Sequence, residues 1–410
     1  MHILLISAYF PPDTGSASHL IYELGKSLYQ RGYEVTVLTS LPGYHTMGDL
    51  GRYKRKLWKR EDYHGLNVVR VASIRLPKRF IFGRALWQFL LAITTLIAGL
   101  IMSKRDVCVV YSPPLPLGLS AWLIKVFRKT PFVFNVQDLF PHNLIETGLM
   151  KKGIAFSIFE KLEKFIYSKA DMITVHAVSN VDHILDRGGT ASKVIAMSNW
   201  VDTDEIVING SPEPFLTKYK LEGCFIVSFA GVLGHLQDLD VVLDAAEVTK
   251  NEDGIKWLIV GDGVQRQRLE DSAKVRKLNN VLFVPMVPRN VYPQVLYASS
   301  VCLATLKKAV TTPVVPSKIL SIMASGKPVV TCMDTEGDAP RLVRNAECGY
   351  TLPPGDGAAL AKVVRILHSD RNLGITMGAN GRKYAESELS LNAATEKYLS
   401  IFSNLNRDTV

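Results

Sequence analysis

The chain has 410 residues, of which 47% are hydrophobic and 21% are charged, so it is long enough to bury two sizeable cores. Its cysteines, Cys108, Cys224, Cys302, Cys332 and Cys348, are scattered without a CxxC pair. This spacing argues against a disulfide or metal framework and fits a reducing cytoplasm. The formal net charge of +10 leaves two classes of polyanionic partner, nucleic acid or an anionic membrane surface.

The first residues, MHILLISAYFPP, are apolar but lack the basic start and the small-residue cleavage site of a signal peptide. They are typical of a β-strand, His2–Ser7, that runs into a Pro-Pro loop. Similar short runs recur along the chain and are separated by helical periods of 10–15 residues. Further predicted strands are Glu34–Thr39, Val68–Ser73, Val107–Tyr111, Phe132–Val136, Met172–Val175, Val194–Met197, Phe225–Ala230, Lys256–Val260, Val281–Val284, Val301–Ala304, Pro328–Cys332 and Gly349–Leu352.

This alternation predicts βαβ units and parallel sheets covered by helices on both faces. Residues 199–224 break the rhythm with Gly, Pro and charge, which indicates a linker. We therefore expect an α/β architecture of two doubly wound, Rossmann-like parallel-sheet domains facing a cleft. The expected boundaries are 1–200, a linker at 201–224, a second domain at 225–385, and a C-terminal helix at 386–410 that returns to the first domain.

Most of the positive charge lies near the start of the chain. Residues 1–112 hold fifteen Lys or Arg and seven Asp or Glu, concentrated in Arg52–Arg60 and Arg75–Arg84. The uncharged stretch Ala85–Met102 follows. Nucleic acid is the weaker interpretation because the basic runs lack the interleaved aromatic residues of a stacking platform.

The stretch 85–102 is at the lower limit for a membrane span. A crossing is excluded because it would place Val68–Ser73 and Val107–Tyr111, two strands of one sheet, on opposite sides of the bilayer. We expect a helix that docks in the membrane interface beside the basic residues. The alternative is a helix that only covers the sheet. Leu86, Leu90, Ile93, Ile97 and Leu100 share one face of this helix, and the residues expected to dock are Trp87, Phe89 and Leu91, with Arg79 and Arg84 as cationic flanks.

Three turns in the second half favour an anionic ligand. The first contains Gly231 and Gly234, the second is Gly261-Asp262-Gly263, and the third is Pro316-Ser317-Lys318 at a helix start. Glycines allow close backbone approach, and helix N-termini attract anions. Each turn alone is often only structural, and Lys318 could be a solvated surface residue. Together on one sheet edge, they predict a diphosphate site.

The order and spacing of these turns resemble the donor domain of GT-B glycosyltransferases of the large retaining family 4. The resemblance runs from residue 3 to about residue 333, through YFPPDTGSASHLIYELGKSLYQRGYEVTVLT, VQDLFPHNLIETGL, SNWVD, AGVLGHLQDLDVVLDAA, VGDG and VPSKILSIMASGKPVV. Within the family, the chain is similar to the WcaI and WbuB group of polysaccharide enzymes, associated with colanic acid and fucosamine transfer.

The resemblance assigns roles to individual residues. Gly15 and Ser16 would lie where the N-terminal glycine-rich loop approaches the donor diphosphate and the acceptor. Asp138 would lie near the transferred sugar, and it and Lys318 are the expected catalytic residues. The remaining expected donor contacts are Gly231, Gly234, Gln237, Ser317 and Lys318 at the diphosphate, and Gly261, Asp262, Gly263, Met286 and Val287 at the nucleoside.

The implied activity is retaining transfer of a sugar from a nucleotide-diphosphate donor, a UDP-sugar such as an N-acetylated deoxyhexosamine, to a polyprenyl-diphosphate-linked saccharide. No cofactor and no metal are expected, and the partners would be the donor, the lipid-linked acceptor and an anionic membrane surface. The protein would be cytoplasmic and peripheral on the inner face of the cytoplasmic membrane.

Some positions depart from the family pattern. Pro313 and Ser321 stand where many members have two glutamates, Gln137 replaces a common histidine, and Val232 and Gln237 replace a basic pair. Two other functions therefore stay open. One is a sugar-nucleotide epimerase of the same fold, which would need acid–base groups of its own and no membrane helix. The other is a catalytically inactive membrane scaffold of a polysaccharide assembly complex.

Metal-binding patterns are weak. Asp202-Thr203-Asp204 has the DxD form of a metal-binding motif, but its position after a predicted strand indicates a turn. The nine histidines show no HxxxH-type ligand spacing.

Overall fold

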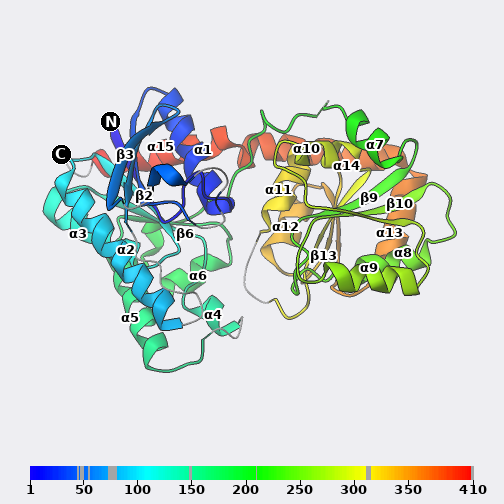
Figure 1. Cartoon of the computed structure of the whole chain (residues 1–410), viewed down its shortest axis with the longest axis horizontal. Helices are drawn as coiled ribbons and strands as arrows, with labels where there is room; N and C mark the ends of the chain where they lie inside the picture. Colours follow the sequence, from blue (N-terminus) through cyan, green and yellow to red (C-terminus); the bar gives the residue numbers. More distant parts are fainter. Residues whose placement is uncertain are drawn as a thin grey trace. The chain divides into compact units, whose positions relative to one another are not determined.

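The computed structural model contains two compact units, the first formed by 1–199 with 394–410 and the second by 200–393 (Figure 1). It describes residues 1–43, 46, 50–53, 56–72, 81–146, 150–208, 210–310 and 315–407. The side chains of residues 81, 82, 84, 85, 146 and 407 lie outside the description, as do Arg79 and Pro313.

The first unit is built on an eight-stranded sheet with the order β3-β4-β2-β1-β5-β6-β7-β8. All neighbours pair in parallel except β3 and β4, which are antiparallel. The strands are β1 (His2–Ser7), β2 (Glu34–Ser40), β3 (Trp58–Tyr63), β4 (Leu66–Val71), β5 (Val107–Ser112), β6 (Phe132–Val136), β7 (Met172–Val175) and β8 (Val194–Ala196). Strands β5 and β6 are buried along their whole length, as expected for a sheet covered on both faces.

Helices cover both faces of this sheet. They are α1 (Ser16–Gln30), α2 (Ile81–Ile101), α3 (Leu117–Arg128), α4 (His142–Glu146), α5 (Ile154–Lys169), α6 (Asn180–Leu185) and α15 (Leu391–Arg407), with short 3-10 turns at Gly51–Tyr53 and Ala191–Lys193. Helices α1 and α15 lie together, where Thr395 Oγ1 donates to Ser27 Oγ at 2.9 Å. Helices α2, α3 and α5 lie along the other face (Figure 1).

The second unit has a six-stranded parallel sheet with the order β11-β10-β9-β12-β13-β14. Its strands are β9 (Phe225–Ala230), β10 (Ile255–Val260), β11 (Val281–Val284), β12 (Val301–Thr305), β13 (Val329–Cys332) and β14 (Gly349–Leu352). Its helices are α7 (Glu213–Tyr219), α8 (Asp240–Val248), α9 (Arg266–Val275), α10 (Tyr292–Ala298), α11 (Ser317–Ala324), α12 (Asp338–Asn345), α13 (Gly357–Ser369), α14 (Arg371–Tyr384) and a π-turn at Ala385–Leu389. The two doubly wound parallel sheets confirm the predicted fold class.

One strand was missed by the sequence reasoning. Strand β3 forms a hairpin with β4 through His64 and Gly65, whose φ values of 55° and 87° suit a two-residue hairpin turn. It lies at the sheet edge and contains Trp58, Lys59 and Arg60 of the predicted basic segment. These residues of the basic segment therefore belong to the sheet. The strand was missed because burial alternates along it with a period of two while most of its residues are charged, a pattern that resembles a solvated run of charges.

The stretch 201–224, predicted to be a linker, packs into the second unit. Ile206, Phe215 and Leu221 are buried in its cores. Arg382 of α14 donates to the backbone oxygens of Ile206 and Thr203 at 2.5 and 3.1 Å. The Gly and Pro residues of this stretch lie in turns around α7. The composition therefore indicated turns within the second unit and not a linker between two domains.

Helix α2 corrects one of the predicted docking residues, Leu91. Leu91 is 1% exposed and lies in the core of the first unit, and Trp87 and Phe89 pack partly against that core. Leu91 therefore cannot contact lipid in this fold. The outward side carries Ile93 and Ile97, each 53% exposed.

The helix is fixed to its neighbour α3 by backbone contacts. Ser120 Oγ donates to the Ala92 carbonyl at 2.7 Å, and a Cβ at Gly99 would lie 2.4 Å from the Ile124 side chain. Strands β4 and β5 on either side of α2 belong to one sheet, as the argument against a crossing required. Within the described residues, the structure contains no helix that combines the length and apolar character needed to span a bilayer.

Candidate functional site

Two glycine turns interlock at the carboxyl ends of β9 and β10 in the second unit. Gly231, Gly261 and Gly263 have φ values of 150°, 153° and 152°, which L-residues with a Cβ rarely adopt. A Cβ at Gly261 would lie 1.8 Å from the Gly231 carbonyl oxygen. The Leu233 amide donates to the Asp262 carbonyl at 2.8 Å. Both predicted turns therefore require glycine, because each backbone passes against the other.

Lys318 lies beside the first of these turns. Its Nζ is 3.1 Å from the position that a Gly231 Cβ would occupy and 3.6 Å from the centroid of the Phe229 ring. Burial lowers the pKa of the Lys318 ammonium from 10.5 to about 7. No described carboxylate lies within ion-pair distance of it. A half-buried cation without a counter-ion is suited to bind an anionic ligand.

The turn residues around Lys318 offer further donors. Ser317 is exposed and is the first residue of α11, which no side chain in the described part of the structure caps. Its N-terminal amides are therefore suited to bind an anion. Gln237 holds the end of its turn because Thr305 Oγ1 donates to its carbonyl. Its amide oxygen would lie 2.7 Å from a Cβ at Gly234, so this glycine also makes room for a side chain.

The predicted nucleoside residues follow the neighbouring strands. Asp262 is exposed and its Oδ1 accepts from the Gly263 amide at 2.8 Å. Met286 is 48% exposed, and with Val287 it lies just beyond the carboxyl end of β11. The Gly261 amide donates to Val284 at the end of that strand, at 3.0 Å. The second turn and the start of the Met286 segment are therefore joined.

Two residues near these turns were missed by the sequence reasoning. Arg266 Nη1 donates to the Gly261 carbonyl at 2.7 Å and to the Val284 carbonyl at 3.3 Å, so it fixes the second turn. Asp238 has a φ of 41°, and desolvation raises the pKa of its carboxyl. Both follow a predicted glycine turn closely, which is the only signal in the sequence that marked them.

In the first unit, the helix α1 begins directly after Gly15. Gly15 has a φ of 125°, and none of the described side chains caps the helix. Ser16 is exposed. The predicted glycine loop is therefore an uncapped helix N-terminus, a local structure that favours a phosphate.

Asp138 follows β6 and is accessible to solvent. The surrounding protein still desolvates its carboxyl enough to raise the pKa, and the nearby His176 opposes that rise. His176 was not predicted, although its place directly after β7 is the equivalent position on the next strand.

The residue before Asp138 belongs to a neutral hydrogen-bond network. Gln137 and Asn199 exchange two amide hydrogen bonds of 2.9 and 2.7 Å. Gln137 also donates to Asn135 Oδ1 at 2.8 Å, and Asn135 Nδ2 donates to Tyr398 of α15 at 3.2 Å. The substitution of a histidine by Gln137 is thus matched by amide partners.

The positions that depart from the family pattern are partly described. Ser321 lies one turn into α11, and its Oγ donates to the Ser317 carbonyl at 3.5 Å. Pro313 lies outside the described residues. Asp202 forms the predicted turn, because its Oδ1 accepts from the amides of Asp204 and Glu205 at 2.9 and 3.1 Å.

One group of potential metal ligands lies in the first unit. His142, Glu163 and His183 have ligand atoms within 4.8 Å of one another. Arg187 already lies among them: its Nη2 donates to His142 Nε2 at 2.8 Å, and its Nε is 3.4 Å from Glu163 Oε2. The guanidinium therefore supplies the positive charge of this cluster, which fits an ion-pair network better than a metal centre.

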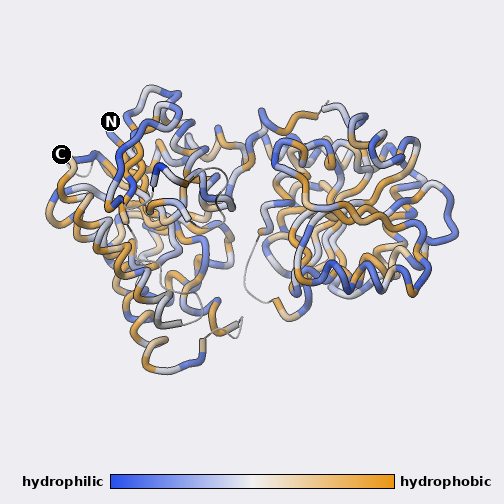
Figure 2. The backbone as a smooth tube through the Cα atoms, in the orientation of Figure 1, coloured by the Kyte–Doolittle hydropathy of each residue, from blue (hydrophilic) through white to orange (hydrophobic). Residues whose placement is uncertain are grey.

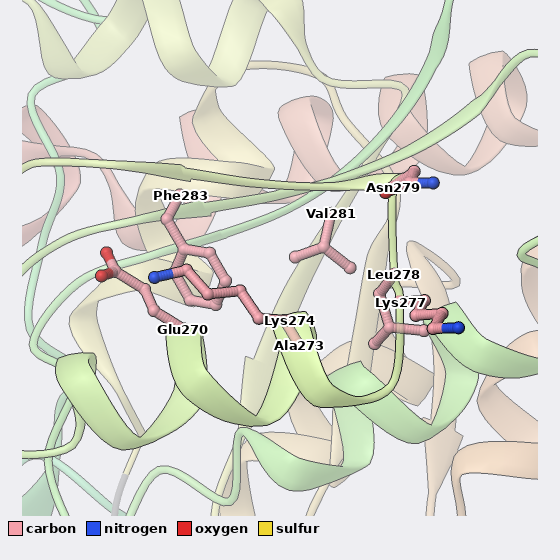
Figure 3. A pocket seen from close by; sticks show the side chains of 8 residues that line it. All are labelled: Glu270, Ala273, Lys274, Lys277, Leu278, Asn279, Val281 and Phe283. Carbon is pink, nitrogen blue, oxygen red and sulfur yellow. The ribbon is translucent and has the colours of Figure 1, made fainter.

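A cavity of about 580 Å³ lies between α9 and β11 in the second unit (Figure 3). Side chains of α9 and β11 line it, including Glu270, Lys274 and Phe283, and Lys277 and Asn279 border its other end (Figure 3). None of the predicted donor residues lines it. We therefore do not assign the donor site to this cavity.

Comparisons with known proteins match both units. Residues 15–200 match the family model "Glycosyl transferase 4-like domain", and residues 224–370 match "Glycosyl transferases group 1". The chain is 28% identical to the probable glycosyltransferase WbjE of Pseudomonas aeruginosa, over 64% of this chain and 66% of that protein. It is 25% identical to the putative colanic acid biosynthesis glycosyl transferase WcaI of Escherichia coli K12, over 80% and 82%.

Solved structures share the fold at lower identity. The crystal structure of Anabaena Alr3699/HepE in complex with UDP has a TM-score of 0.73 and 16% identity, and the match covers 98% of this chain and 100% of that one. Sucrose-phosphate synthase from Thermosynechococcus elongatus has a TM-score of 0.75 and 16% identity, with 98% of each chain covered.

Proposed function

Because the chain belongs to the GT-B glycosyltransferases of family 4, we propose that it transfers a sugar from a nucleotide-diphosphate donor to a polyprenyl-diphosphate-linked saccharide. The transfer would retain the anomeric configuration and serve cell-surface polysaccharide synthesis. The proposed donor is a UDP-sugar such as an N-acetylated deoxyhexosamine. The observation that carries the proposal is the Lys318 ammonium against the Gly231 turn, with no described counter-ion.

The proposed donor contacts act on the leaving group. As the bond between sugar and diphosphate breaks, negative charge develops on the phosphate oxygens. Lys318 and the N-terminus of α11 would stabilise that charge, and preorganised donors of this kind are often the largest catalytic contribution. The glycine turns let the backbone amides approach the same oxygens. These groups supply the positive charge, so the proposed reaction uses no metal ion.

The acceptor side needs a base and a positioning group. Because the sequence offers no obvious carboxylate nucleophile for a double displacement, we propose same-face substitution in which a leaving phosphate oxygen takes the acceptor proton. Asp138, whose pKa is raised by desolvation, would orient the sugar or polarise its hydroxyl groups. The open N-terminus of α1 at Gly15 would contact phosphate in the same way as α11.

The direct test is the reaction itself. The protein is incubated with UDP-, GDP- and dTDP-sugars, with and without a polyprenyl-diphosphate-sugar acceptor, and the products are identified by mass spectrometry and by the anomeric proton coupling. Product that depends on the acceptor and retains the donor's configuration supports the proposal. An inverted anomer refutes retention, and an altered free nucleotide sugar supports the epimerase alternative. Donor binding without any product supports the inactive scaffold.

We also propose that the protein is peripheral on the cytoplasmic face of the membrane, because its acceptor would be a lipid. Helix α2, whose backbone trace is largely coloured hydrophobic in Figure 2, supports this with an outward apolar stripe. The stripe is formed by Leu86, Ile93, Ile97 and Ile101, which are 50, 53, 53 and 77% exposed. Phe127 of α3 is 66% exposed, and Arg128 of the same turn donates to the α2 backbone at Leu100. The stripe is the face opposite to the core residue Leu91.

An anionic bilayer fits this stripe better than water does. Fully burying an Ile side chain contributes about 1.5–3 kcal/mol, and each nearby Lys or Arg about 1 kcal/mol. Lys104 and Lys129, at the ends of α2 and α3, are exposed. We expect the protein to sediment with anionic vesicles, and salt to weaken only the electrostatic part of binding.

The test replaces the stripe and spares the core. The variant with Ile93, Ile97 and Ile101 changed to Ser should stay folded and no longer sediment with the vesicles. It should still transfer sugar to a short soluble acceptor. In the matched control, Val264, Val275 and Ile375, which are exposed in the second unit, are changed to Ser, and this variant should sediment as the wild type does. A folded stripe variant that still binds vesicles contradicts the proposed surface.

A further inference from the structure

A fully buried arginine joins the edge hairpin of the first unit to the loop before α1. Arg70 of β4 is 0% exposed. Its Nη2 donates to the Pro11 carbonyl at 2.5 Å, and its Nε is 2.6 Å from Glu61 Oε1 on the paired strand β3. The same loop carries the chain from β1 to Gly15.

Glu61 is held ionised by several donors. Lys59 Nζ lies 2.7 Å from its Oε2, and Tyr53 Oη donates to its Oε1 at 3.0 Å. Burial alone would raise the pKa of Glu61, but the hydrogen bonds from Lys59 and Arg70 lower it to about 2. The Glu61 carboxyl is therefore ionised at neutral pH.

A buried ion pair such as Glu61–Arg70 contributes little to the net stability of a fold. Desolvating two charges costs several kcal/mol per ion, and apolar replacements of similar volume are often neutral or stabilising. What an apolar side chain could not do is bind the Pro11 carbonyl. Pro11 and Pro12 have no amide hydrogen, so neither residue can donate a backbone hydrogen bond that would hold this part of the loop in place.

The loop has a second anchor three residues from the helix. Asp13 is 2% exposed, its Oδ1 accepts from the Gly43 amide at 2.9 Å, and its amide donates to the Phe10 carbonyl at 3.1 Å. The Arg70 guanidinium carbon lies 5.7 Å from the centroid of the Phe10 ring. The loop is thus held at Pro11 from the hairpin and at Asp13 from the segment after β2.

We propose that the Glu61–Arg70 pair positions the loop 11–15, and through it the uncapped N-terminus of α1 at Gly15 and Ser16, for binding the phosphate groups of the substrate. This inference rests on the proposed function for the identity of the ligand. Arg70 is fully buried and acts only through the Pro11 carbonyl, so it is a positioning residue.

The chain offers a matched control for Arg70. Arg105 is another buried arginine of the first unit, 6% exposed, and its Nη1 donates to the Ser103 carbonyl at 2.9 Å. It precedes β5 and so lies at the amino edge of the same sheet, away from Gly15. The changes Arg70→Lys and Arg105→Lys both keep the charge and both remove a guanidinium that binds backbone.

The first readout is amide hydrogen exchange of residues 13–18, which does not depend on activity. We expect Arg70→Lys to speed exchange in this segment at least tenfold, and Arg105→Lys to leave it unchanged. Unchanged exchange in Arg70→Lys overturns the proposal. A rise spread evenly over the first unit overturns it too, because that pattern reports global destabilisation.

The second readout is kinetic. We expect kcat/KM to fall at least tenfold in Arg70→Lys and less than twofold in Arg105→Lys, and equal losses in the two variants would contradict positioning. Should Arg70→Lys not fold, Glu61→Leu, which removes the acceptor that holds the Arg70 Nε at 2.6 Å, carries both measurements with the same criteria. A wild-type protein that transfers no sugar refutes the proposed function, while the exchange data still decide the positioning role.

Discussion

Replacing Lys318 by Met separates the binding role of its charge from any role in folding. The ammonium lies 3.6 Å from the Phe229 ring centroid, and burial lowers its pKa to about 7, so the free protein already carries the cost of a poorly hydrated cation. A bound diphosphate would supply the missing opposite charge. Charge-assisted hydrogen bonds contribute about 1.5–3 kcal/mol, which corresponds to a loss of roughly 10- to 150-fold in donor affinity or rate.

Because the pKa of Lys318 is lowered, we expect both kcat/KM for the donor and the stability of the fold to depend on pH. In the folded protein, Lys318 loses its proton near pH 7, so kcat/KM for the donor should fall as the pH rises from 6 to 8, and Lys318→Arg should flatten that fall. Between about pH 7 and 10.5 the unfolded chain binds a proton at this site that the folded chain does not, so stability rises with pH. Lys318→Met should therefore be more stable than the wild type at pH 7, by a margin that shrinks toward pH 10.

Donor titration calorimetry and urea unfolding, each at pH 6, 7 and 8, measure these effects. The control is Lys327→Met. Burial also lowers the pKa of Lys327, but its Nζ donates to the Tyr297 carbonyl at 2.9 Å, so its loss should not weaken donor binding. A folded Lys318→Met protein whose donor affinity stays within twofold of the wild type would refute the proposed role.

Three further changes test other parts of the structure. Asp138→Asn should keep the fold and the donor affinity but depress transfer, as measured by calorimetry and product formation, and a collapse of donor affinity would instead place Asp138 in the donor site. Gly261→Ala should lose donor binding and about 1 kcal/mol or more of stability, because its Cβ would lie 1.8 Å from the Gly231 oxygen; unchanged binding would show that the turn can shift. Leu91→Ala should lower the free energy of unfolding by about 2–5 kcal/mol, whereas Ile97→Ala should cost less than about 1 kcal/mol in the same urea titration; equal losses would contradict the assignment of the two faces of α2.

The strands were accessible from the sequence because a buried parallel strand is apolar on both sides. Each predicted strand corresponds to a strand whose ends differ by at most two residues, the largest difference being at β4. Strand β3 was missed because an edge strand with one solvated face carries charges that mask its period. The glycine turns were recognised from local sequence, since a positive φ and a close backbone contact both demand glycine wherever the rest of the chain lies.

The sequence could not assign the faces of α2, because apolar residues occur on all its sides. Packing against α3 and the sheet decided that Leu91 is core and Ile97 is outward. The same limit applies to charge: composition counts Lys59, Arg70 and Lys318 alike as cations. Only the fold shows that Lys59 and Arg70 bind Glu61, while Lys318 has no described counter-ion. Local sequence thus determined the strands and turns, which depend on near neighbours, whereas the partners of each charge depend on residues far apart in the chain and were decided by the tertiary structure.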